Sequence, residues 1–360
     1  MSKKKITNKA EQQDFAKKVS PLKILWPLII GLGVFGLILY FQLKDKEIPF
    51  QLLPINAKAV FWLFIAALFM AMRDVGYIIR FKILSNNQVS WLQAIRVILL
   101  WEFTSAISPS AVGGTSIAVI FVHKEGISIG RSSAIVMATS FLDELYFIIM
   151  FPILILVTGA DDLFNIGSSQ GMSFTNEFFY FAVVGYGLKF TYLAVLSYGL
   201  FINPKMIKYL ILKIFSIGFL RRWRNQARRA GLDIIDNSKE LRGQSFMFWL
   251  KTFGATFVSW TSRYWVVNAM FLAFFVFEKS HFLLFARQLV MWIMMLVSPT
   301  PGGSGFSEFV FSEYLSDFLP EVAGITIIMA FIWRLFTYYP YLLIGAVMVP
   351  RWIKDKFGKK

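Results

Sequence analysis

Two breaker motifs decide the fold: Ser108-Pro-Ser-Ala-Val-Gly-Gly-Thr115 and Ser298-Pro-Thr-Pro-Gly-Gly-Ser-Gly305. Each interrupts an apolar stretch, and proline with paired glycine ends a helix because it removes a donor and loosens the backbone. The apolar pieces on either side are too short to cross about 30 Å of hydrocarbon comfortably. We therefore predict two helical hairpins, over residues 91–122 and 282–318, that enter the membrane and turn back.

The rest of the chain consists mainly of longer apolar runs. Only 16% of the 360 residues are charged, against about 25% in soluble domains, which excludes a soluble enzyme and a disordered protein. The runs are continuous rather than alternating, which argues against a membrane β-barrel. The predicted fold class is an all-α polytopic membrane protein with about six full spans and two re-entrant hairpins, within a domain of residues 24–350. The spans are residues 24–43, 57–79, 132–158, 178–202, 246–277 and 322–349.

The predicted spans place the most basic segments of the chain on the same side of the membrane. The net charge is +16, and Lys and Arg are dense in the tail 1–23, the insert 203–243 and the tail 351–360. The loop 159–177 contains neither. Because basic loops stay in the cytoplasm, we expect both termini to be cytoplasmic. The insert fits an amphipathic interfacial helix, which serves either as a topology signal or as a platform for anionic lipid or a partner.

The spacing around the two breakers indicates an inverted-topology repeat. Arg73 lies 36 residues before Pro109 and Arg263 lies 36 before Pro299, while Glu144 and Arg334 each lie 35 after the corresponding proline. Repeat A covers about residues 57–158 and repeat B about 246–349, and they enter the membrane with opposite polarity. This plan is common in alternating-access transporters. Few identities are shared, so chance spacing is the alternative.

Ionisable residues inside spans and unpaired N–H groups at hairpin tips are the candidate site. Ionisable residues are costly inside a membrane and therefore mark functional positions. Unpaired N–H groups at the N-terminus of a half-helix suit a phosphate group. Asp143, Glu144 and Glu308 are candidates for proton coupling or charge balance. The alternatives are ion pairs, snorkelling arginines and helix breaks that serve packing alone. The predicted substrate-binding residues are Arg73, Gly113, Gly114, Thr115, Arg263, Pro299, Thr300, Gly302, Gly303, Ser304 and Arg334.

No constellation for catalysis or metal binding stands out. The chain has no cysteine, and its two histidines, His123 and His281, are far apart. We expect no cofactor, no metal, no enzymatic activity and no nucleic-acid partner.

The second motif resembles that of a known family. The stretch from Ser298 to Glu308, followed by Trp333-Arg334-Leu335, is similar to the lysylphosphatidylglycerol synthase transmembrane region, also called the flippase-like domain. The first-half motif, Pro109 with Gly113-Gly114 and then Leu142-Asp143-Glu144, is looser because Ala-Val precedes its glycines. The resemblance covers about residues 21–350.

The resemblance implies a bacterial inner-membrane protein that moves a polar lipid between leaflets. It also implies functional roles for Pro299, Gly302, Gly303, Glu308 and Arg334, with Gly113, Gly114 and Glu144 as first-half counterparts. In two-domain synthases a soluble aminoacyl-transferase domain follows this region. The present chain ends at Lys360, so a stand-alone form without lysyl transfer is expected.

Three functions are consistent with the sequence. The leading hypothesis is a lipid transporter that holds the headgroup of a phospholipid or polyprenyl phosphate between the hairpin tips and intramembrane arginines. The second is a membrane-embedded transferase acting on a lipid-linked substrate. The third is a non-transporting partner of a lipid-modifying enzyme. A homo-oligomer is compatible with each.

Overall fold

The computed structural model describes residues 50–108, 111–164, 175–214, 239–276, 280–295, 305–322 and 324–357, with single residues at 33, 40, 216, 235 and 303. Among these residues every regular element is helical. The predicted tail 1–23, almost all of the predicted span 24–43 and the larger part of the insert 203–243 lie outside the described residues.

Four helical segments of the described part are long and apolar enough to cross a membrane, and they coincide with four predicted spans. The segment nearest the C-terminus consists of two helices that are separated by a break at Tyr338. The segments are α3 (Ala57–Leu84), α6 (Ile129–Thr158), α8 (Thr175–Ser197) with the π-turn η2 (Tyr198–Ile202), and α14 (Ile325–Thr337) with α15 (Tyr339–Phe357). The chain is therefore a multi-pass membrane protein.

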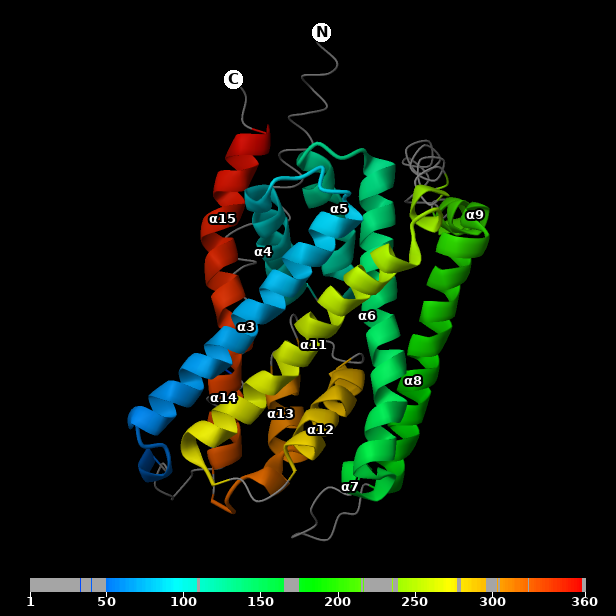
Figure 1. Cartoon of the computed structure of the whole chain (residues 1–360). Helices are drawn as coiled ribbons and strands as arrows, with labels where there is room; N and C mark the ends of the chain where they lie inside the picture. The colour runs from blue at the N-terminus through cyan, green and yellow to red at the C-terminus, as the bar shows by residue number, and fades with distance from the viewer. Residues whose placement is uncertain are drawn as a thin grey trace.

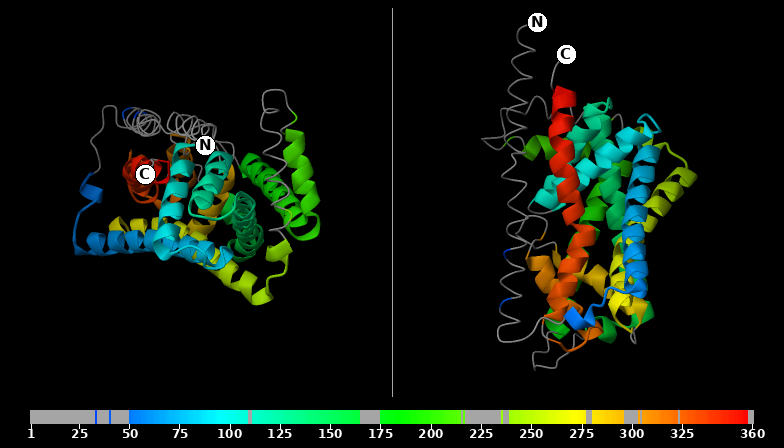
Figure 2. Two further views of the ribbon diagram at one scale, coloured as in Figure 1. Left: turned by 90° about the horizontal axis from the view of Figure 1, so that it is seen from above. Right: turned by 90° about the vertical axis from the view of Figure 1, so that its left-hand side faces the viewer.

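The predicted span 246–277 forms α11 (Phe246–Phe274), which is as long as α3 but more polar, with Lys251 and Arg263 in its sequence. It runs antiparallel to α3, and the two helices form one face of the bundle (Figures 1 and 2). Side chains cap the first turns of both helices: Asn56 accepts from the Ala59 N–H, and Ser245 accepts from the Phe248 N–H. The pair is the scaffold against which the shorter helices pack.

Two pairs of shorter helices occupy opposite halves of the bundle (Figure 1). The helices α4 (Trp91–Ile107) and α5 (Ala111–Lys124) lie toward the end where α15 finishes. The helices α12 (His281–Met294) and α13 (Phe306–Tyr314) lie toward the other end, beside α7 (Ala160–Phe164). We call these the C-terminal end and the α7 end. Short helical turns, η1 (Phe50–Leu52) and η5 (Ser316–Phe318), and the amphipathic α9 (Pro204–Ile214) complete the described elements.

Helix α3 continues beyond the end predicted for it. The predicted span stops at residue 79, which leaves Arg80 and Lys82 after its end. Both residues instead lie within the helix and are buried. Arg80 pairs with Asp143, and the Lys82 ammonium donates to the Val89 carbonyl at 2.7 Å. These internal partners allow two cations to remain inside the helix bundle, because a buried charge is tolerated when it is paired and hydrogen-bonded.

The predicted polar tail 351–360 also begins as helix. Helix α15 runs through Pro350 to Phe357, with the buried Trp352 packed edge-on against Phe121 of α5 at 5.0 Å. The first part of the tail is therefore an element of the C-terminal end of the bundle.

Candidate functional site

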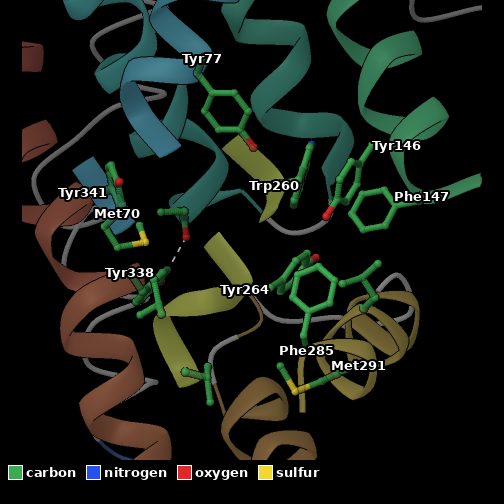
Figure 3. Close-up of a cluster of buried hydrophobic side chains, with 14 of the residues drawn as sticks. Met70, Tyr77, Tyr146, Phe147, Trp260, Tyr264, Phe285, Met291, Tyr338 and Tyr341 are labelled. Carbon is green, nitrogen blue, oxygen red and sulfur yellow. Dashed lines mark hydrogen bonds between the residues drawn. The ribbon is translucent and has the colours of Figure 1, made fainter. Parts of the chain in front are cut away.

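A cavity of about 290 Å³ lies among α3, α4, α6, α11, α12 and α14, where the two short-helix pairs approach one another. Aromatic rings make up much of its wall, and Figure 3 shows several of them from α3, α11 and α15 turned toward this region. The aromatic lining residues are Tyr77, Trp101, Trp260, Tyr264, Trp292, Trp333, Tyr338 and Tyr341. Four arginines also line it: Arg73, Arg80, Arg263 and Arg334.

Arg73 is held by two carboxylates from α3 and α4. Its side chain is 1% exposed, with Nη1 lying 2.8 Å from Oδ1 of Asp74 and Nη2 contacting Glu102. Nη1 also donates to the hydroxyl of Tyr341 at 2.8 Å. Because the guanidinium presents a rigid fork of donors, these contacts fix its orientation between α3, α4 and α15.

Arg80 lies two turns after Arg73 on the same face of α3. Its Nη1 is 2.5 Å from Oδ1 of Asp143 on α6 and donates to Thr256 on α11 at 3.2 Å. The Trp260 indole donates to the same Asp143 oxygen at 2.7 Å. Asp143, predicted as a coupling residue, therefore lines the cavity and balances the charge of Arg80.

Arg334 is paired at the start of α13. Its Nε donates to Oε1 of Glu308 at 3.0 Å, and its Nη2 contacts Ser307. Glu308 is 2% exposed, and its Oε2 also accepts from the Gly305 N–H at 2.8 Å. Glu308 therefore has two roles. It caps α13, as an acidic side chain at a helix N-terminus does, and it neutralises the charge of Arg334. One backbone N–H of the second breaker motif, that of Gly305, is therefore already hydrogen-bonded within the protein.

Arg263 differs from the other three arginines. Its guanidinium carbon lies 5.7 Å from the ring centre of Trp260 and 5.4 Å from that of Trp292. Among the described residues it forms no ion pair with a carboxylate, whereas each of its three neighbours in the cavity does. The two indole faces partly stabilise the cation, and Arg263 lines the cavity.

A second unsatisfied donor stands next to Arg263. Tyr264 is 5% exposed and lines the cavity, and its hydroxyl has no hydrogen-bond partner among the described residues. A buried hydroxyl that is left unpaired destabilises the fold by about 1–3 kcal/mol. Arg263 and Tyr264, adjacent on α11, both line the cavity.

The remaining predicted residues divide between the cavity and other places. Thr115 and Gly303 line the cavity, and Gly303 has the positive φ of 69° that favours glycine. Gly114 serves close packing, because a Cβ there would lie 2.8 Å from the Ser105 Cα. Gly113 lies in the helical backbone of α5. The positions outside the described residues are Pro299, Thr300, Gly302 and Ser304.

Glu144 faces away from the cavity. Its carboxylate lies 2.8 Å from the ammonium of Lys189 on α8, and that ammonium sits over the Phe147 ring at 4.6 Å. The neighbouring residues Asp143 and Glu144 thus point to different partners, one toward α3 and one toward α8. Only Asp143 belongs to the cavity site.

The sequence of the chain is similar to those of known membrane proteins. The family model described as the lysylphosphatidylglycerol synthase TM region matches residues 28–345, nearly the whole chain and every helix that lines the cavity. The chain belongs to this family. A UPF0104 membrane protein of Archaeoglobus fulgidus is 26% identical over 348 residues, which cover 92% of this chain and 98% of the relative. No solved structure matches the chain.

In this member of the lysylphosphatidylglycerol synthase TM family, the sequence analysis missed Arg80, Tyr77 and Tyr264 as site residues. A signal for the first two was present, because positions 73, 77 and 80 follow the helical spacing that places side chains on one face. Nothing local marks Tyr264, since its importance arises from an unpaired hydroxyl inside the fold.

Proposed function

We propose that this protein moves the headgroup of a phosphate-bearing polar lipid between the two leaflets through the central cavity, while the acyl chains stay in the bilayer. The observation that carries the proposal is Arg263. Arg263 is half-buried beside two indole rings and has no carboxylate partner among the described residues, and partial desolvation of an unpaired cation is unfavourable. An anionic group that enters the cavity supplies the missing partner, and charge-assisted hydrogen bonds to phosphate are among the strongest available.

The groups around Arg263 support a phosphate ligand. The Tyr264 hydroxyl donates to a phosphate oxygen, and the indoles of Trp260 and Trp292 keep the guanidinium in place. A cavity of about 290 Å³ lies at the small end of ligand pockets, which suits a headgroup and excludes the acyl chains. Phospholipids and polyprenyl phosphates both present such a headgroup.

The two short-helix pairs act in this proposal as re-entrant hairpins of an inverted repeat. Helices α4 and α12 have 17 and 14 residues, or about 26 and 21 Å at 1.5 Å per residue. Both lengths fall short of the hydrocarbon thickness of about 30 Å. Arg73 and Arg263 take equivalent positions on the two long helices, with the Ser259 hydroxyl donating to the Arg73 carbonyl at 3.0 Å between them.

The charge distribution supports an orientation with the C-terminal end in the cytoplasm. Basic residues of the described part at that end include Lys124, Arg131, Lys354 and Lys356, whereas the α7 end carries Asp161, Asp162, Asp317 and Glu321. Positive residues are retained on the cytoplasmic side. The carboxylates Asp143 and Glu308 serve charge balance, because each already neutralises an arginine.

Leaflet exchange of fluorescent phospholipids in proteoliposomes tests the proposal. Arg263→Gln should lower the exchange rate at least about tenfold, since one charge-assisted hydrogen bond contributes about 1.5–3 kcal/mol. Lys251→Gln removes an exposed cation from the same helix outside the cavity and should exchange lipid like the wild type. The proposal fails if Arg263→Gln equals the wild type. It also fails if the wild type moves none of a panel of zwitterionic, anionic and polyprenyl-phosphate lipids.

A further inference from the structure

An ion-pair cluster closes the base of the first hairpin at the C-terminal end, outside the cavity. Glu125 follows α5, and its side chain is fully buried. Nη1 of Arg96 on α4 lies 3.4 Å from Oε1 of Glu125, and Nζ of Lys356 on α15 lies 2.8 Å from Oε2. We call these three residues root clamp 1. It joins both legs of the hairpin to the end of the last helix.

A matching cluster closes the base of the second hairpin at the α7 end. Arg287 on α12 is 3% exposed, and its Nη1 lies 2.9 Å from Oδ2 of Asp317 in η5, directly after α13. The same guanidinium donates to the Asp162 carbonyl of α7 at 2.9 and 3.3 Å. We call Arg287, Asp317 and the Asp162 carbonyl root clamp 2.

The two clamps share one design. In each, an arginine in the first half of the first leg, the sixth of the 17 residues of α4 or the seventh of the 14 residues of α12, pairs with a carboxylate just after the second leg. The carboxylate follows the arginine by 29 residues in the first clamp and by 30 in the second. The third member comes from the far end of the closing helix of the other half: Lys356 ends α15, and Asp162 follows α6. Each hairpin is therefore tied at its base to the opposite half of the molecule, and the two ties lie at opposite ends (Figure 1).

We propose that root clamps 1 and 2 are the two gates of the cavity, one for each side of the membrane; for the passage of lipid this rests on the proposed function. Opening either path requires a hairpin base to separate from the closing helix of the other half, and the clamp is a polar contact that resists this separation. Both clamps are formed in this structure. Alternate release of one clamp while the other holds exposes the cavity to one side at a time, as alternating access requires.

The absence of cysteine from the chain makes the gates measurable. Ser140 lines the cavity and is half-buried, so Ser140→Cys provides a single thiol there. Single-cysteine variants Gln88→Cys and Asp161→Cys, exposed at the C-terminal and α7 ends, fix the orientation in proteoliposomes. A membrane-impermeant cationic thiosulfonate is then applied from each side, and the modification rate of Cys at position 140 is measured.

Each gate variant should open one side only. Glu125→Gln should raise modification from the C-terminal end at least about fivefold and leave the other side unchanged. Arg287→Gln, which removes the hydrogen bonds to the Asp162 carbonyl, should do the reverse. Lys356→Gln keeps the Arg96–Glu125 pair intact and should raise the modification rate less than Glu125→Gln does, from the same side. It serves as the test of this clamp if Glu125→Gln does not fold. Arg131→Gln breaks the exposed pair with Glu240 at 2.6 Å at the C-terminal end and should change neither rate.

Equal increases from both sides, or no increase in any folded clamp variant, would overturn the gate assignment. Lipid exchange measured on the same preparations separates the two proposals. One-sided accessibility in a protein that moves no lipid would contradict the proposed function and support the gates. Lipid exchange without one-sided accessibility would contradict the gates alone.

Discussion

At the scale of single residues, the four arginines that line the cavity differ in the groups that they contact. Three of them hold carboxylates: Arg73 contacts Asp74 and Glu102, Arg80 contacts Asp143, and Arg334 contacts Glu308. The fourth, Arg263, holds only indole faces among the described residues. Residues 109–110 and 296–302, which lie outside the described part, contain no acidic side chain. This unequal pairing is the reason why we propose Arg263 as the arginine that binds the ligand.

The Glu308–Arg334 pair gives a prediction at this scale. Glu308→Gln deprives the buried Arg334 cation of the Glu308 countercharge, and breaking one partner of a buried pair destabilises a protein by about 3–5 kcal/mol. We expect a marked fall in thermal stability in detergent for Glu308→Gln and for Arg334→Gln. The double variant should be less destabilised than the sum of the two, because coupled residues are not additive. Additive losses would show that the two residues do not stabilise one another.

At the scale of elements, close helix contacts set the shape of the cavity. Helices α3 and α11 approach closely at Gly76, where a Cβ would lie 2.8 Å from the Ala255 carbonyl and collide with the Ser259 side chain. Small residues at such crossings let membrane helices pack backbone to backbone. This crossing brings Arg73 and Arg263 to the same cavity.

A matched pair of glycines tests the crossing. Gly76→Ala should destabilise the protein by about 1–3 kcal/mol through overpacking. Gly254→Ala lies on the partner helix where an added Cβ meets no atom within 4 Å, and it should be neutral or slightly stabilising because alanine favours helix over glycine. Thermal unfolding in detergent compares them. Equal effects of the two substitutions would contradict the assigned contact.

The elements also show what could be predicted from the sequence. Apolar length and the proline–glycine breakers are local signals, so four apolar helical segments lie where spans were predicted and the short helices lie beside the breakers. The ends of α3 and α15 were predicted too early. Pairing partners are not local. Arg80 is buried within α3 because it pairs with Asp143, 63 positions away in the sequence. Glu144 lies outside the cavity because it pairs with Lys189 on α8. Which arginine would lack a carboxylate could not be predicted, because that depends on the packed helices.

At the scale of the whole molecule, Lys124, Arg131, Lys354 and Lys356 lie at the C-terminal end, whereas Asp161, Asp162, Asp317 and Glu321 lie at the α7 end. The proposed orientation based on this bias predicts the sidedness of labelling. In cells, Gln88→Cys should react only with reagents that reach the cytoplasm, and Asp161→Cys should react with impermeant reagents outside. Glu321→Cys should behave like Asp161→Cys, because it follows the second hairpin at the α7 end. Labelling of positions 88 and 321 from the same side would rule out the proposed orientation.

The most direct test of the account is cross-linking of a lipid headgroup to the cavity. A phospholipid with a photoreactive group on its headgroup is reconstituted with the wild-type protein, illuminated, and the labelled peptides are mapped by mass spectrometry. A lipid with the same group at the end of an acyl chain is the control. The account predicts headgroup labels on the cavity-lining parts of α11 and α12, around Tyr264 and Trp292, and acyl-chain labels on lipid-facing positions such as Val258. Headgroup labels confined to the two ends of the bundle would contradict passage through the cavity.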